Sequence, residues 1–235
     1  MSYDNNVNVY SSDGRIKQVE YAMKAMNLGS TTIAIKLEDC IILASEKKLA
    51  NSLQKPDSIK KHFKIFDNIV TAFAGVTADA PTIIKKCRQM CTNHMFVYDT
   101  TIPSQMLMNN ICSLALKFSE DDYSKMIYSR PFGASFVVAV YEEEPKLFFI
   151  DPSGSYMEYR AKAIGSASEM VENQLEKEID TFKEESSSVI KVLEMLKSVM
   201  KDKITVHNVE LSILRKEGLQ KFDTEALNPL LEAIK

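Results

Sequence analysis

Residues 13–31 read DGRIKQVEYAMKAMNLGST, and three features of this stretch organise the first part of the chain. An Asp-Gly pair opens it, apolar residues then recur at helical spacing, and Gly29 stands where a helix would stop. The apolar positions are Ile16, Val19, Met23 and Met26. We therefore expect a short amphipathic helix over residues 15–28, preceded by a polar tail over residues 1–14.

Strand-like segments follow this helix. Residues 31–37 and 40–45 are rich in β-branched side chains and flank a Glu-Asp turn, and residues 63–66 and 69–74 flank an Asp-Asn turn in the same way. Two consecutive hairpins of this kind predict an antiparallel sheet.

The rest of the chain alternates pairs of helices with groups of strands. Helical spacing covers residues 78–98, 103–120, 166–182 and 187–201, and strand patterns cover 134–141, 146–150, 155–159 and 209–214. Two antiparallel sheets, each covered by one helix pair, would bury all these apolar faces. We therefore predict an α+β fold, a four-layer αββα sandwich. No linker or composition shift divides it, so we expect one domain over residues 1–235, in which Pro229 would interrupt a helix starting at Asp223.

Composition excludes several classes of protein. The 235 residues carry 29 Lys and Arg against 32 Asp and Glu, a net charge of −3, and 45% are hydrophobic, which is typical of a folded globular domain. Such a balance gives no field for nucleic acid, and the apolar runs are too short to span a membrane. The N-terminus lacks the pattern of a secretion signal, so we expect a reducing compartment and four free thiols.

One spacing could be read as a metal site. Cys87, Cys91 and His94 share one helical face and could present three zinc ligands. Since no fourth ligand stands at a recognisable spacing, we interpret the two cysteines as small core residues and expect no metal and no cofactor.

Several fixed motifs carry a resemblance to a known family. They are Tyr3-Asp4, Val7-Asn8, Asp13-Gly14-Arg15, Gln18-Val19-Glu20-Tyr21-Ala22, Gly29-Ser30-Thr31, Arg130-Pro131-Phe132-Gly133, Asp151-Pro152-Ser153-Gly154 and Ala163-Ile164-Gly165-Ser166-Ala167. Together they resemble proteasome α-type subunits, most of all those of type 5, over essentially the whole chain.

The resemblance implies both architecture and partners. It implies the same αββα sandwich, shared with N-terminal nucleophile hydrolases, and a place in the seven-membered outer ring of the proteasome core particle. The implied partners are other α subunits, the β-ring subunits and the C-terminal tails of activators. The implied role is ring building, gating and activator docking in ubiquitin-dependent protein degradation, in the cytoplasm and nucleus.

The resemblance also raises the question of catalysis. Ser30, Glu46 and Lys61 fall at the positions of the nucleophile, acid and lysine of the catalytic β-type subunits. That mechanism needs a free α-amine on residue 30 as a base, and residues 1–29 lock Ser30 in an amide. We therefore expect no catalysis. Two alternatives stay open: a β-like peptidase that uses Ser30 after processing, and a free-standing interaction domain without a ring.

Lys61 has a second interpretation within the resemblance. The lysine at this position lines a pocket between neighbouring subunits that receives the C-terminal carboxylate of an activator. Gly75 would allow a close backbone approach there, and Ile16 and Glu20 would lie nearby on the N-terminal helix. Without the resemblance, Lys60, Lys61 and Lys64 would be read as a solvated strand edge.

The N-terminal tail is the implied gate. Tyr3, Asp4 and Tyr21 would form the cluster that orders its open form. Asn5 stands where the family usually has arginine, and Ser12 where it usually has proline. These departures remove a charged partner for a carboxylate and a rigid turn, so we expect a tail that helps to close the pore but a weakened open-gate cluster.

Overall fold

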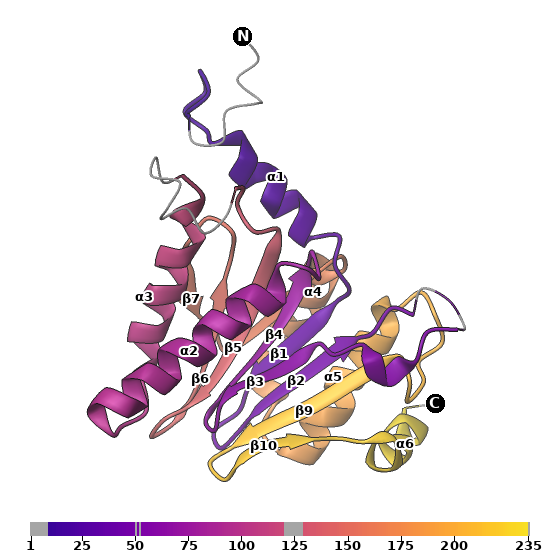
Figure 1. Cartoon of the computed structure of the whole chain (residues 1–235). Helices are drawn as coiled ribbons and strands as arrows, with labels where there is room; N and C mark the ends of the chain where they lie inside the picture. The colour runs from indigo at the N-terminus through magenta and orange to yellow at the C-terminus, as the bar shows by residue number, and fades with distance from the viewer. Residues whose placement is uncertain (1–8, 50, 52, 120–128, 235) are drawn as a thin grey trace.

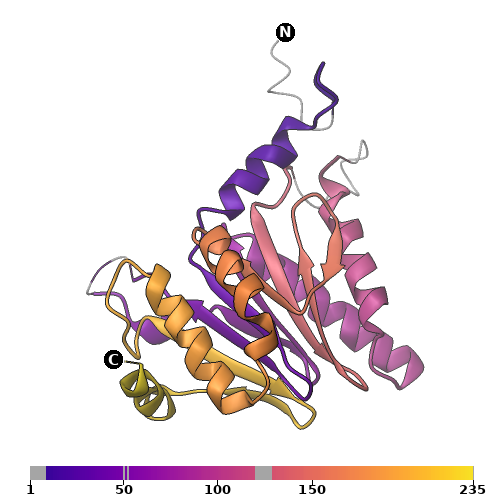
Figure 2. The same ribbon diagram turned by 180° about the vertical axis from the view of Figure 1, so that it is seen from behind.

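The computed structural model of the chain describes residues 9–49, 51, 53–119 and 129–234. Two five-stranded antiparallel sheets stack face to face, and a pair of helices covers the outer face of each (Figures 1 and 2). The four layers confirm the α+β sandwich predicted from the sequence.

Each sheet draws its strands from distant parts of the chain. The first has the order β10-β9-β2-β1-β8 and consists of β1 (Thr32–Lys36), β2 (Ile41–Glu46), β8 (Ala161–Ile164), β9 (Val209–Arg215) and β10 (Gly218–Lys221). The second has the order β3-β4-β5-β6-β7 and consists of β3 (His62–Phe66), β4 (Ile69–Gly75), β5 (Ala134–Tyr141), β6 (Pro145–Ile150) and β7 (Tyr156–Glu158). The two predicted hairpins thus belong to different sheets.

The helices are α1 (Lys17–Met26), α2 (Ala80–Tyr98), α3 (Ser104–Ala115), α4 (Ser168–Glu178), α5 (Glu185–Val199) and α6 (Thr224–Ala233), with short 3-10 turns at Pro56–Ser58, Lys117–Ser119 and Ile179–Thr181. α2 packs on β3 beside α3, and α4 and α5 pack on the first sheet. None of the described helices combines the length and the hydropathy that a membrane crossing requires.

The core forms three apolar layers. One lies between the sheets, one under α2 and α3, and one under α4 and α5. On β2, Ile41 and Leu43 face the other sheet, whereas Ile42 and Ala44 face the helices. Because both faces of its central strands are covered, β2 is buried along its whole length, as its unbroken apolar run predicts.

The N-terminal helix lies at one end of the sandwich. α1 contacts β4 and β5 and extends beyond the ends of the strands (Figure 1). Of its residues only Ala22 is fully buried, and the apolar positions predicted from the sequence are half-buried. The apolar stripe of α1 is therefore only partly covered by its own chain.

Side chains close the outer side of edge strand β3. The guanidinium of Arg88 donates two hydrogen bonds to the carbonyl of Lys64, at 2.8 and 3.0 Å. Lys221 Nζ donates to the carbonyl of His62 at 2.7 Å, and Glu210 Oε2 accepts the amide of Lys61 at 2.7 Å. These bonds occupy backbone groups that an edge strand would otherwise offer to another strand.

The helix expected to start at Asp223 is present, but the interruption expected at Pro229 does not occur. α6 begins after Asp223, whose Oδ1 accepts the amide of Ala226 at 2.9 Å, and it runs through Pro229. The proline leaves the carbonyl of Glu225 without its usual amide partner, but Glu225 lies on the exposed side. Leu227 and Leu231 are buried on the opposite side, and their packing holds the helix together.

Candidate functional site

Lys61, immediately before β3, is a buried cation, and no carboxylate of the described residues lies within ion-pair distance of its ammonium. Its side chain is only 6% exposed, and Nζ lies 4.5 Å from the centre of the Phe73 ring. Within the described part of the chain, its ammonium makes no ion pair and no hydrogen bond. Burial lowers the pKa of Lys61 to about 8, although the charges of Glu46 and Glu210 act in the opposite direction.

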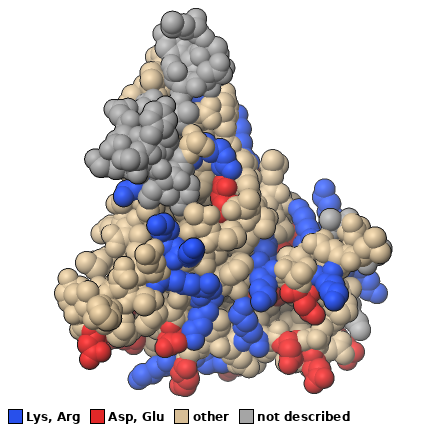
Figure 3. Space-filling view, viewed as in Figure 1, with Lys and Arg blue, Asp and Glu red and all other residues tan. Residues whose placement is uncertain are grey.

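A pocket of about 540 Å³ opens beside this ammonium. It is lined by Leu28, Gly29, Ser30, Lys48, Gln54, Ser58, Ile59, Lys60, Lys61, Phe63, Phe73, Gly75, Thr77 and Pro81. Lysine and arginine side chains gather over α2 and β3 on the face seen in Figure 3. A pocket with an unpaired buried ammonium and further lysines at its rim suits a compact anion.

Gly75 lies in close contact with other backbone segments of its own chain, while its expected role in an activator pocket stays a prediction. Its φ is +113°, and a Cβ at this position would lie 2.2 Å from the carbonyl oxygen of Gly133 and 2.8 Å from Cα of Met26. A side chain there would push α1 and the start of β5 away from the pocket wall.

The structure brings the three hydrolase-like positions close together. Ser30 and Lys61 line the same pocket. Glu46, at the end of β2, is 6% exposed, and its Oε2 accepts the amide of Thr31 at 3.4 Å. Since Glu46 raises the pKa of Lys61, the two charges lie within electrostatic reach. The arrangement resembles a catalytic set with one group missing, the α-amine of residue 30.

The chain before Ser30 is built into the fold. The carbonyl of Gly29 accepts the amide of Ser166 at 2.9 Å, and the backbone at Gly165, with φ of +97°, lies so close that a Cβ would stand 2.6 Å from the carbonyl oxygen of Ser30. Ser30 is thus fixed in an internal peptide bond, and its nitrogen has no lone pair available for a proton.

Ile16 and Glu20, the other predicted pocket residues, are not among those that line the Lys61 pocket. Ile16 precedes α1 and is half-buried, and Glu20 Oε1 pairs with Arg15 Nη1 at 3.3 Å. Their assignment to an activator pocket stays a prediction, because that pocket would form between neighbouring subunits.

The predicted gate residues lie only partly within the described chain. Tyr3, Asp4 and Asn5 fall outside it, and Ser12 is an exposed turn residue. Tyr21 is 43% exposed and borders a second pocket of about 200 Å³, together with Gln18, Ala22, Ala25, Val76, Arg130, Pro131 and Gly133. Arg130 anchors this wall through two hydrogen bonds to the carboxylate of Asp79, at 2.8 and 3.0 Å.

The cysteine and histidine spacing on α2 has a structural explanation. Cys87 and Cys91 belong to the apolar layer under the helix, and burial raises the pKa of their thiols to about 12 and about 11. His94 Nδ1 lies 3.0 Å from the carbonyl of Thr100. The described residues contain no group of three or more potential metal ligands.

A row of buried, hydrogen-bonded polar side chains links the two sheets, and sequence patterns did not indicate it. The hydroxyls of Thr32 and Ser45 lie 2.7 Å apart, and Ser45 Oγ lies 2.7 Å from Nε2 of His62. His62 Nδ1 lies 2.8 Å from Ser212 Oγ. Burial lowers the pKa of His62 to about 4, so the ring is neutral at physiological pH. In the sequence, only polar residues at alternating positions of the strands could have indicated this row of hydrogen-bonded side chains.

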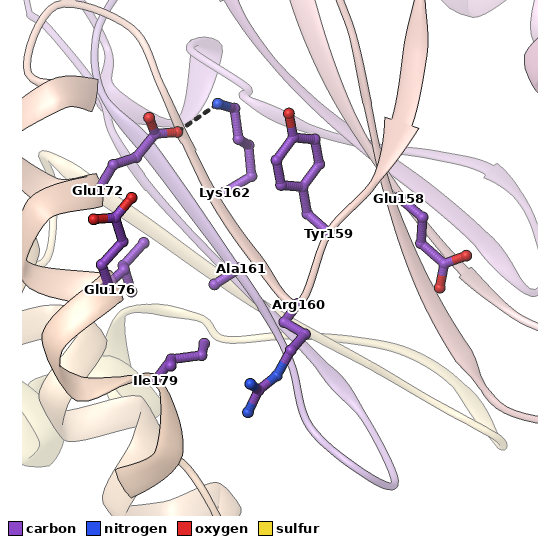
Figure 4. Close-up of a pocket in the computed structure, with 9 residues that line it drawn as sticks. Glu158, Tyr159, Arg160, Ala161, Lys162, Glu172, Glu176 and Ile179 are labelled. Atoms are coloured by element: carbon purple, nitrogen blue, oxygen red, sulfur yellow. Dashed lines mark ion pairs between the residues drawn. The ribbon is translucent and has the colours of Figure 1, made fainter.

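A further pocket, of about 440 Å³, lies between α4 and the segment that joins β7 to β8 (Figure 4). Lys162 Nζ pairs with Glu172 Oε1 at 2.6 Å and lies 4.8 and 4.9 Å from the ring centres of Phe149 and Tyr159. The charge of Lys162 is paired with a carboxylate, and this distinguishes the pocket from the one at Lys61.

Two family descriptions match the chain. The proteasome subunit family matches residues 26–214, and the N-terminal signature of A-type proteasome subunits matches residues 3–25. The second match covers the tail and nearly all of helix α1, the part that holds four of the eight motifs of the resemblance.

Curated relatives agree with these matches. The chain is 48% identical to a probable type-5 alpha subunit of the proteasome from Encephalitozoon cuniculi, over 92% of this chain and 93% of that protein. It is 41% identical to a probable type-5 alpha subunit from Schizosaccharomyces pombe, over 92% and 88% of the two chains. It is 37% identical to the type-5 alpha subunit of Caenorhabditis elegans, over 91% and 86%. With its sandwich, its α1 helix and its N-terminal signature, the chain belongs to the proteasome subunit family and is an α-type member of it.

Proposed function

We propose that the chain is a non-catalytic subunit of the outer ring of the proteasome core particle. It would assemble with other α subunits in a seven-membered ring, contact the β ring, and help to gate substrate entry during ubiquitin-dependent degradation in the cytoplasm and nucleus. The α-type signature at residues 3–25 supports this assignment, because that signature contains the tail and helix to which ring building and gating are ascribed.

One observation carries the non-catalytic part of the proposal. Ser30 is joined to Gly29 by a peptide bond inside a packed backbone, so its nitrogen is an amide and cannot act as a base. Ser30 and Lys61 line the same pocket, but the mechanism of this fold uses the α-amine of the nucleophile's own residue as the base, and in Ser30 that nitrogen is part of a peptide bond.

The test is Ser30→Ala in the assembled particle. Peptide hydrolysis should stay within about a factor of two of wild type, because the hydroxyl takes no part in the chemistry. A large loss of turnover in particles of normal composition would overturn the non-catalytic assignment and favour a processed, β-like peptidase.

We further propose that the Lys61 pocket docks the C-terminal carboxylate of an activator. The unpaired ammonium supports this, because a buried charge without a partner is costly and a carboxylate would supply the missing partner. The lysines at the pocket rim add positive charge along the approach.

Lys61→Ala tests this proposal with a peptide copy of a single activator tail, so that several tails cannot mask the loss. Binding to assembled particles should weaken at least tenfold, equivalent to about 1.4 kcal/mol or more. Lys64→Ala is the matched control, since Lys64 belongs to the same lysine cluster but is exposed and does not line the pocket, so its loss should change the affinity little. Unchanged binding to Lys61→Ala particles contradicts the assignment, and equal losses from both variants would reduce it to a diffuse charge effect.

A further inference from the structure

The Lys61 amine has an environment that favours covalent chemistry as well as ion pairing. The residue is only 6% exposed, its amine rests on the face of Phe73, and no carboxylate of the described residues lies within ion-pair distance. Its sequence neighbour Lys60, by contrast, is exposed to solvent. Desolvation without a counter-ion is the condition under which a lysine amine becomes nucleophilic near neutral pH.

The same pocket offers room and a second recognition element. Its volume of about 540 Å³ leaves space beside the amine for a small molecule, and the Ser30 hydroxyl is a further polar group in its lining. Lys48 and Lys60 line the pocket as well, and Lys48 is near enough to lower the pKa of Lys61. A small ligand that carries a carboxylate would be held by these cations while its other end faces Lys61 Nζ.

We propose that the Lys61 pocket is a covalent site for small oxo acids, compounds with an aldehyde or ketone next to a carboxylate. The neutral amine attacks the carbonyl carbon and forms a carbon–nitrogen bond. The carbonyl oxygen then leaves as water with the two amine hydrogens, and an imine remains. The step is a condensation, so it needs no oxidant or reductant, and it reverses by hydrolysis.

The imine would also regulate the site. Once Lys61 carries an adduct, its nitrogen no longer presents the compact ammonium that an activator carboxylate needs. The adduct would therefore compete with docking, and this second part rests on the docking function proposed above.

The experiment uses the assembled particle with glyoxylate as the probe and cyanoborohydride, which reduces the imine to a stable secondary amine. Peptide mapping then gives the labelling rate of each lysine at about pH 7.4. We expect Lys61 to be labelled at least tenfold faster than Lys60, with a rate that levels off above about pH 8, where the Lys61 amine is neutral. Equal rates at the two lysines, or a Lys61 rate that keeps rising to about pH 10, would overturn the proposal.

Three controls separate the parts of the inference. Acetaldehyde, which lacks a carboxylate, should label Lys61 at least threefold more slowly than glyoxylate, and equal labelling overturns the recognition of the carboxylate. Lys61→Arg should give no adduct at residue 61, and its other lysines should react as in wild type. A single-tail activator peptide should protect Lys61. Selective labelling without protection would uphold the covalent site and refute the docking function on which the regulatory part rests.

Discussion

Lys61 and His62 are consecutive residues that meet opposite surroundings. The Lys61 side chain points into a pocket with its charge unpaired, whereas the His62 ring is enclosed between the sheets with both nitrogens in hydrogen-bond contact. Alternation along β3 explains the difference, because successive side chains of a strand point to opposite sides. A lysine that lines a pocket and a histidine that belongs to the core can therefore be neighbours in sequence, although the charge of Lys61 contributes to the lowered pKa of His62.

His62 gives a prediction about acid stability. Its pKa is lowered from 6.5 to about 4 by burial, so the folded chain binds fewer protons than the unfolded chain between these values. The stability that neutral His62 contributes is complete above pH 6.5 and is lost as the pH falls toward 4. Between about pH 6.5 and 4.5 the loss amounts to about 2 kcal/mol.

The matched variant is His62→Gln, which keeps a donor and an acceptor but cannot titrate. It should be less stable than wild type at neutral pH, but its unfolding free energy from urea titrations should fall less over the same acid range. If both proteins lose stability equally over that range, another group is responsible and His62 is not the sensitive residue.

Only part of the candidate site could be predicted from the sequence. The resemblance to a family singled out Lys61 and Gly75, and both line the pocket. Glu210 and Lys221, which hold the backbone at Lys61 and His62, stand 149 and 159 positions away in sequence from the residues they bind. Contacts of this kind depend on the pairing of β9 and β10 with the first sheet, and no local pattern reveals it.

Helix α1 has an apolar stripe that its own chain covers only in part. Its apolar positions Ile16, Val19, Met23 and Met26 are half-buried, and its fully buried residue is Ala22 alone. A stripe that is covered on one side by β4 and β5 leaves apolar area for a neighbouring subunit.

Deletion of residues 1–28 should therefore prevent ring formation or cause aggregation, because it uncovers the ends of β4 and β5 and removes the remaining stripe. Native mass spectrometry of the co-expressed particle measures this directly. Deletion of residues 1–12 is the matched control; it leaves α1 intact and should permit assembly. Normal rings from the longer deletion would refute the role of α1 as an interface helix.

Some long elements were predicted accurately, although the helix predicted over residues 103–120 ends at Ala115. The patterns placed α2 and β5 within two residues at either end, because a long apolar repeat has one consistent solution. They missed β8 and β10, which have four residues each and carry lysines. Both are edge strands, and their pairing with β1 and β9 rather than their composition makes them strands.

At the scale of the whole molecule, the sandwich limits how the chain can associate. Arg88 and Lys221 occupy the outer carbonyls of β3. The β3 edge of the second sheet is thus blunted against the addition of another strand. The half-buried apolar stripe of α1 is a better candidate surface for assembly than this edge.

The mass of this chain, taken from purified and assembled particles, tests the central claim most directly. A non-catalytic outer-ring subunit should retain the residues before Ser30, since α1 and Gly29 are part of its packed structure. We predict a mass that includes residues 13–29 at the least, whatever trimming occurs at the tail. A chain that begins at Ser30 would possess the missing α-amine beside Lys61 and Glu46, and would contradict the account.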